Sequence, residues 1–291
     1  MLAATPYEGQ IVTMSQSIIK LSNRSLLKIT GEDARGFLNR ILTCRVDDLE
    51  PGGATFGALL TPQGKIICDL FLYNNDDALF LDLPVPVSGD IQKRLTMLKL
   101  RADVQIEACE EMSVALSEDA EKADACHAHF HDPRRDGLLL RLLLNEQKPE
   151  LTVPSDKYHQ YRAENTLPEC CLDYETSSVF PADVNMDLMG GVDYKKGCFV
   201  GQEVVSRMKR KAEVRKRTVT LTGAASAVAG DEVKAGTAKI GDVLSWSGNS
   251  GLVILRLDRL KSAQERDEIP ELNGAVVEIS FPPGVEAPAN V

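Results

Sequence analysis

One thiol stands out among the side chains that could do chemistry, that of Cys198 in the segment 195–203, Lys-Lys-Gly-Cys-Phe-Val-Gly-Gln-Glu. Two glycines in this segment give the backbone freedom to turn tightly and to let a ligand approach. A helix expected to begin near Gln202 brings its N-terminal dipole close to the sulfur, and the ammonium of Lys196 stands just upstream, so both favour the thiolate over the thiol. A small buried cysteine in a connecting loop is the alternative. The pattern predicts a reactive thiol at Cys198 with Lys196 beside it.

Polar groups elsewhere could line a ligand site. Asp69 interrupts an apolar, strand-like run at 66–72. Burying a carboxylate is costly unless it is paired or faces a polar cavity. Asp69 is therefore expected either in such a cavity or on the solvated face of an edge strand, and both alternatives stay open. Asp183 and Asn185 precede the thiol segment, and for Asp183 the alternative is a capping role at the turn 186–189.

The elements that must position these groups fit within 291 residues, a length that suits roughly two or three modules. Hydrophobic residues make up 43% and charged residues 26%, which is ordinary for a globular protein. No apolar run approaches the roughly 20 residues needed to cross a bilayer. The net charge of −10 argues against nucleic acid as a partner. The basic stretch 207–217 is a local exception, either a solvated face or a site for an anionic ligand.

The cysteines indicate a reducing compartment. The chain has seven, with no Cys-x-x-Cys pair, which is typical of free thiols and not of a disulfide framework. The first ten residues lack the basic and apolar regions of a secretory signal, so a cytoplasmic location is expected. Cys126 and three histidines up to His131 have no second matching pair, and no metal site is predicted.

Local patterns predict helices alternating with hairpin strands, which indicates α+β layers. Apolar spacing predicts a helix within 31–43, and a Pro-containing turn at 61–64 joins strands at 54–60 and 65–73. Further elements are expected as a strand at 79–83, a helix from Ser88, a strand at 102–106, and helices at 156–164 and 202–211. From Arg217 onward, short β-type runs punctuated by glycine predict a small antiparallel barrel.

The octapeptide 196–203, Lys-Gly-Cys-Phe-Val-Gly-Gln-Glu, resembles the signature of the YgfZ family, which is related to the T-protein (aminomethyltransferase) of the glycine cleavage system. Weaker similarities follow in the right order along nearly the whole chain, at 31–43, 61–70, 100–102, 132–134, 161–168, 181–185 and 215–217. Three positions depart from the family pattern, with Thr166 in place of Gly, Asp183 in place of Glu and Phe199 in place of Tyr.

This resemblance implies an α+β fold in which three modules form a ring around a central folate site. Its folate-binding region would span residues 1–214, in two α+β modules at 1–108 and 109–214, and an antiparallel β-barrel would span 215–291. The implied cofactor is tetrahydrofolate, with or without a polyglutamate tail. The implied role is support of iron–sulfur enzymes, with those enzymes or cluster-assembly proteins as partners, and without nucleic acid or membrane.

The resemblance also implies roles for single residues. Asp69 matches an aspartate of the T-protein that contacts the reacting end of folate, and a carboxylate at Asp183 suits the adjacent donors of a pterin ring. The implied folate-binding residues are Asp69, Asp183, Asn185, Gln202, Glu203 and Arg207. The implied catalytic residues are Cys198 and Lys196.

Two other functions remain open at this point. One is a folate-dependent aminomethyltransferase of the T-protein type, which turnover of an aminomethylated carrier would reveal. The other is a non-catalytic folate sensor or scaffold, in which Cys198 would be replaceable without loss of function. The T-protein lacks the cysteine signature, which favours the iron–sulfur role.

Overall fold

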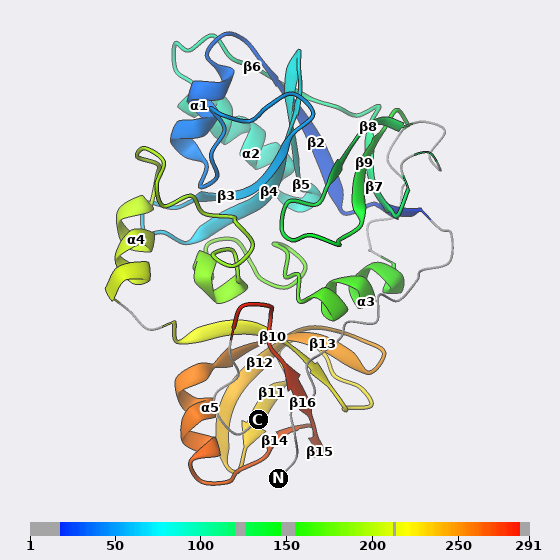
Figure 1. Cartoon of the computed structure of the whole chain (residues 1–291), viewed down its shortest axis with the longest axis vertical. Coiled ribbons are helices and arrows are strands. Elements are labelled where there is room, and N and C mark those ends of the chain that lie inside the picture. Colours follow the sequence, from blue (N-terminus) through cyan, green and yellow to red (C-terminus); the bar gives the residue numbers. More distant parts are fainter. Residues whose placement is uncertain (1–17, 120, 122–125, 147–154, 212–213, 286–291) are drawn as a thin grey trace.

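The computed structural model describes residues 18–119, 121, 126–146, 155–211 and 214–285. These residues form three β-sheets, two of them close together in one half of the molecule and the third in a separate half (Figure 1). The segment from α3 (Asp156–Asn165) to α4 (Gln202–Lys211) lies between the two halves (Figure 1). The thiol segment therefore belongs to the connecting layer and not to a sheet.

The first sheet has five antiparallel strands in the order β3-β4-β5-β2-β6. Its strands are β2 (Arg24–Thr30), β3 (Ala54–Leu60), β4 (Ile66–Asn75), β5 (Ala78–Pro84) and β6 (Gln105–Ala108). The turn predicted at 61–64 joins β3 to β4, and the N–H of Gly64 donates to the carbonyl of Thr61 at 2.9 Å. This hairpin places Asp69 in the middle of β4, paired with Ala58 of β3.

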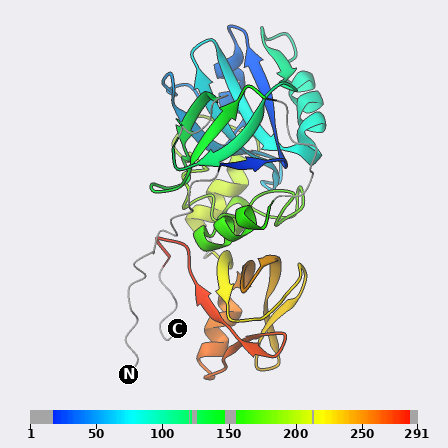
Figure 2. The same cartoon turned by 90° about the vertical axis from the view of Figure 1, so that its right-hand side faces the viewer.

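Two helices, α1 (Ala34–Ile41) and α2 (Val85–Leu98), pack on one face of this sheet. The buried side chains of α1 follow the apolar spacing that predicted it, with Phe37, Leu38 and Ile41 facing the sheet. The second helix begins before the Ser88 expected from sequence, because Pro86 is accommodated in the first turn, where an N–H is not needed. Figure 2 shows α2 on the side of the sheet opposite the green strands of the second sheet.

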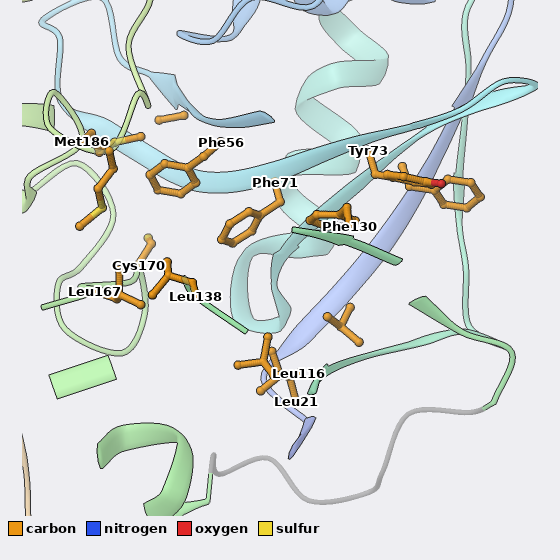
Figure 3. Packing of buried hydrophobic residues seen from close by; sticks show 14 of the residues in the cluster. Leu21, Phe56, Phe71, Tyr73, Leu116, Phe130, Leu138, Leu167, Cys170 and Met186 are labelled. Carbon is orange, nitrogen blue, oxygen red and sulfur yellow. The ribbon is translucent and has the colours of Figure 1, made fainter. Parts of the chain in front are cut away.

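The second sheet has four antiparallel strands in the order β1-β7-β9-β8. These are β1 (Ile19–Leu21), β7 (Ser113–Ser117), β8 (Cys126–His131) and β9 (Leu140–Leu144). Its apolar face shares one core with the face of the first sheet that lies opposite α1 and α2. In this core Tyr73 stacks on Phe130 with ring centroids 5.3 Å apart (Figure 3). Phe71 and Met186 continue this core into the connecting layer.

The other part of the molecule, formed by the C-terminal residues from Lys216 to Ser280, is built on a single antiparallel sheet of seven strands with its own core. The strand order is β15-β14-β11-β12-β13-β10-β16. Its elements are β10 (Lys216–Thr222), β11 (Glu232–Ala235), β12 (Ala238–Ser247), β13 (Ser250–Arg256), α5 (Leu257–Gln264), β14 (Pro270–Leu272), β15 (Ala275–Val276) and β16 (Glu278–Ser280). The predicted α+β fold with a C-terminal antiparallel barrel is confirmed. The module boundaries after residues 108 and 214 stay predictions.

Candidate functional site

Cys198 is the only exposed cysteine of the seven, all of which lie in described residues. It occupies the loop between the short 3₁₀ helix η2 (Pro181–Val184) and α4, with the buried side chains of Lys196 and Phe199 on either side. Burial makes a thiol less reactive, because it disfavours the charged thiolate and keeps reagents away from the sulfur. Among the cysteines, Cys198 is therefore the one a protein partner can reach directly.

The ammonium of Lys196 is turned into the protein. Its Nζ donates to the carbonyl oxygens of Leu42 at 2.7 Å and Cys44 at 2.5 Å, and it lies 5.3 Å from the ring centroid of Phe199. Burial lowers the pKa of Lys196. Two of its three donors are thus committed to a loop more than 150 residues earlier in the chain. The structure gives Lys196 the contacts of a positioning residue that anchors the thiol segment.

The two ends of the thiol segment are fixed by different means. At the start, Asp193 accepts from the backbone N–H groups of Lys195 at 2.7 Å and Lys196 at 3.1 Å, and also from Arg45 at 2.7 Å. At the end, Gly201 has a φ of +82°, and a Cβ there would lie 2.7 Å from the carbonyl oxygen of Thr61. Gly201 therefore serves close packing onto the β3–β4 turn.

Lys196→Met is expected to destabilise the fold by about 1–3 kcal/mol, because two buried carbonyls lose their donor. The thiol segment should also lose its anchor, so the alkylation rate of Cys198 should change with it. Urea unfolding and timed alkylation read by mass spectrometry measure both effects. The exposed neighbour gives the control, and Lys195→Met should leave both quantities near those of the parent. Equal behaviour of the two variants would contradict the anchoring role.

Asp69 lies in the interior and not on a solvated edge. Its carboxylate is 1% exposed, and Oδ2 accepts from the hydroxyl of Tyr174 at 2.6 Å and the backbone N–H of Cys170 at 2.8 Å. Burial raises the pKa of Asp69, and the Arg24 guanidinium acts against this rise. Oδ1 has no hydrogen-bond partner among the described residues and lies 3.7 Å from Arg24 Nη1, which likewise has none. Asp69 Oδ1 can therefore still accept a hydrogen bond, and the neighbouring Arg24 Nη1 can still donate one.

A buried network of charged groups surrounds Asp69. Its further members are Arg24, Asp82, Asp132, Arg134, Arg141, Tyr158 and Glu169. Glu169 joins the network at its centre, since it accepts from Arg134 at 3.1 Å and from the hydroxyl of Tyr158 at 2.6 Å. Burial alone would raise the pKa of Glu169, but the guanidinium groups of Arg24 and Arg134 outweigh it and lower the pKa to about 2. This network holds the connecting layer against both upper sheets.

Asp183 and Asn185 connect this layer to the barrel. Asp183 Oδ2 accepts from the N–H of Phe180 at 3.0 Å, which is a capping contact at the start of η2, and burial raises the pKa of Asp183. Asn185 is fully buried, and its Nδ2 donates to the carbonyl of Thr218 at 2.9 Å. Asp183 does make a capping contact, but it is with Phe180 at the start of η2 and not with the turn 186–189 that the sequence suggested.

The remaining implied folate residues, Gln202, Glu203 and Arg207, lie on α4 at the edge of the molecule (Figure 1). Glu203 and Arg207 are exposed, whereas Asp69 is enclosed. The structure thus divides the implied site, with Asp69 in the interior and the other three at the surface. The basic stretch 207–217 is also divided, because Arg217 is 5% exposed and donates to the carboxylate of Asp187 at 2.6 Å.

Sequence reasoning missed two features of this region. The first is the arginine network, whose signal was an arginine inside an apolar strand, Arg141 in β9. The second is the contact between the adjacent cysteines Cys170 and Cys171. Their sulfur atoms lie 3.7 Å apart, next to Asp69.

Comparisons with known proteins agree with this architecture. Residues 2–117 match the GCVT N-terminal domain, and residues 215–285 match the C-terminal β-barrel domain of CAF17. The crystal structure of glycine cleavage system aminomethyltransferase T from Bartonella henselae covers 93% of this chain and 85% of its own, with a TM-score of 0.67 and 16% identity. That likeness shows the fold.

Among curated proteins, the mitochondrial iron–sulfur cluster assembly factor IBA57 of Mus musculus is 28% identical over 90% of this chain and 82% of its own length. The human protein of the same name is 28% identical over 83% of this chain and 78% of its own. None of the helices in the described residues has the length and apolar character needed to span a bilayer.

The expected cytoplasmic location is contradicted, because the curated relatives are named as mitochondrial proteins. The expectation rested on free cysteines and the lack of a secretory signal, and neither feature separates the cytoplasm from another reducing compartment. The likeness in sequence and in fold extends over both halves of the molecule. The chain thus combines a region similar to the GCVT N-terminal domain with a region similar to the C-terminal β-barrel domain of CAF17, and its fold resembles that of an aminomethyltransferase.

Proposed function

We propose that this protein supports the assembly or repair of iron–sulfur enzymes through the thiol of Cys198, on a fold that binds reduced folate. The observation that carries the proposal is the exposure of Cys198 on a loop anchored at Asp193, Lys196 and Gly201. Support comes from the similarity to iron–sulfur cluster assembly factors and from the octapeptide of the YgfZ family.

The chemistry of the thiol fits transfer better than storage. Iron–sulfur clusters are held by cysteine thiolates, usually about four of them. Cys198 is a single exposed thiol, and the other six cysteines are buried or partly buried. One thiolate can therefore hold a cluster only together with ligands from a partner protein. We infer that the cluster is cargo, shared at Cys198 with a cluster-assembly protein or a recipient enzyme.

The folate part of the proposal rests on Asp69 and its surroundings. Asp69 Oδ1 and Arg24 Nη1 form an ion pair at 3.7 Å but have no hydrogen-bond partner in the described part of the chain, and Phe71 lies against the same network. A pterin offers adjacent N–H donors and an aromatic face, so these groups fit it. When bound, tetrahydrofolate would supply one-carbon or redox chemistry. The chain's own contribution is to orient the pterin through Asp69 and Arg24.

Asp69→Asn is expected to weaken the binding of reduced folate about 10-fold or more, because it removes an anionic acceptor from an enclosed site. Isothermal titration calorimetry with tetrahydrofolate and its mono- and polyglutamylated forms measures this. Asp183→Asn provides the matched control, with a smaller expected effect because Asp183 caps η2. Absence of binding by the parent protein would refute the folate part of the proposal and leave the thiol part standing.

A further inference from the structure

Two adjacent thiols, those of Cys170 and Cys171, meet at the turn between Glu169 and Tyr174. Their Sγ atoms are 3.7 Å apart, which is contact distance. Cys171 has a φ of +68°, in the left-handed region that side chains other than glycine seldom occupy. The turn is held by the N–H of Cys171, which donates to the carbonyl of Tyr174 at 2.9 Å. The unusual backbone thus brings two neighbouring side chains together.

The two thiols have different surroundings. Cys170 is 1% exposed and packs in the shared core, whereas Cys171 is partly exposed. Either thiol can be the donor in their contact, the thiol of Cys170 also reaches the carbonyl of Ile67 at 3.7 Å, and the contact with Cys170 lowers the pKa of Cys171. The same contact and burial raise the pKa of Cys170. Cys171 is therefore the cysteine that can react first with a reagent from solution, and the thiol of Cys170 lies next to the sulfur that has reacted.

The pair is also joined to the interior carboxylate. The backbone N–H of Cys170 donates to Asp69 Oδ2 at 2.8 Å, and the hydroxyl of Tyr174 donates to the same oxygen at 2.6 Å. Both donors belong to the turn that carries the thiols. A change in the backbone at Cys170 and Cys171 therefore reaches Asp69 directly.

We propose that Cys170 and Cys171 are a redox modification site, at which a low-molecular-weight disulfide such as oxidised glutathione converts the two thiols into a reversible disulfide between neighbouring residues. The thiolate of Cys171 attacks one sulfur of the reagent, forms a mixed disulfide and releases one thiolate. The sulfur of Cys170, losing its proton, then displaces the second glutathione thiol. The two cysteines lose two electrons and two protons, and the reagent is reduced to two thiols.

The disulfide changes the contacts of Asp69. Two sulfur atoms now 3.7 Å apart must come within bonding distance, about 2 Å, and the peptide between them must turn with them. That peptide carries the N–H of Cys171, which then leaves the carbonyl of Tyr174, and Tyr174 is the residue whose hydroxyl donates to Asp69 Oδ2. Oxidation of the pair is thus expected to reduce the affinity of the Asp69 site for its ligand. This last step rests on the proposed folate function, whereas formation of the disulfide does not.

The test uses the full chain, treated with oxidised glutathione and measured by intact-mass and peptide mass spectrometry. The peptide that contains both cysteines should lose the mass of two hydrogen atoms and regain it with dithiothreitol. Cys198 is the internal control, since no second thiol contacts it among the described residues, and it should keep one glutathione. Cys170→Ser should stop at a mixed disulfide on Cys171, and Cys171→Ser should remain unmodified at Cys170.

Two results would overturn the proposal. One is a mixed disulfide on Cys171 that persists in the parent protein, and the other is a disulfide that joins Cys171 to the peptide of Cys68. A second arm compares tetrahydrofolate binding before and after oxidation in a Cys198→Ser background, where a several-fold loss is expected. If the reduced protein binds no folate, the proposed function fails while the mass measurement still decides the disulfide.

Discussion

Glu169→Gln is expected to lower the free energy of unfolding by about 3–5 kcal/mol, the largest loss we expect from a single substitution that changes no side-chain size. Glu169 is 1% exposed and lies among the guanidinium groups of Arg24, Arg134 and Arg162. The amide keeps hydrogen bonds but removes the charge, so these cations stay buried without enough compensation. Urea unfolding at neutral pH measures the loss. Glu203→Gln, at an exposed position of α4, should change stability by less than about 0.5 kcal/mol.

The same carboxylate predicts a particular sensitivity to acid. The pKa of Glu169 is lowered to about 2 in the fold, against an ordinary value of 4.5. A carboxylate with a depressed pKa contributes stability above its unfolded pKa, and this contribution disappears as the pH falls from about 4.5 to about 2. The contribution is about 3 kcal/mol. The raised pKa of Asp69 has the opposite effect on the pH dependence of stability. Asp69 is present in both the parent and Glu169→Gln, so the difference between these two proteins reports on Glu169 alone.

Unfolding should therefore be measured for parent and Glu169→Gln at several pH values between about 5 and 2. The difference in the free energy of unfolding between the two proteins should decrease as the pH falls, because the parent loses the contribution of the Glu169 charge and the variant has no such charge to lose. A gap that stays constant through this range would show that the charge of Glu169 does not stabilise the fold.

Much of the fold could be predicted because its signals are local. The helix α1 follows from the spacing of Phe37, Leu38 and Ile41, and the β3–β4 hairpin from the turn at 61–64. The barrel follows from short strands punctuated by glycine. Helix starts were less accurate, since α2 begins at Val85 and not at Ser88, where a hydroxyl suggested a cap.

The candidate site could be predicted only in part, because its contacts are long-range. Cys198 could be singled out from its own segment, and the structure shows it exposed, while its reactivity stays a prediction. The direction of Lys196 could not be predicted, since its acceptors are the carbonyls of Leu42 and Cys44, 154 and 152 residues away. A lysine next to a thiol in sequence was interpreted as a partner of that thiol. Two distant carbonyls determine where its ammonium lies.

Asp69 shows the same limit. The sequence left open whether Asp69 faces a polar cavity or lies on the solvated face of an edge strand. In the structure its carboxylate is buried among polar partners from other segments. Its partners Cys170 and Tyr174 are 101 and 105 residues away, and Arg24 is held on the neighbouring face by Asp82 across 58 residues. Such pairings depend on how the sheets stack, which no local pattern encodes.

Cys198→Ser is expected to abolish function while leaving the fold intact. The side chain is exposed, and serine differs from cysteine by one atom, so the free energy of unfolding should change by less than about 0.5 kcal/mol. A serine hydroxyl is not deprotonated at neutral pH and does not replace a thiolate as a ligand for iron. Cys109→Ser is the matched control, because Cys109 is partly exposed and lies outside the thiol segment.

The central claim is that the thiol of Cys198 is the working group, and complementation tests it most directly. Parent, Cys198→Ser and Cys109→Ser are expressed at equal levels in cells that lack the protein, and the activities of iron–sulfur enzymes are measured. We predict that parent and Cys109→Ser restore these activities and that Cys198→Ser does not, although it accumulates as a folded protein. Full restoration by Cys198→Ser would contradict the account and leave Cys198 a residue of the loop without a chemical role.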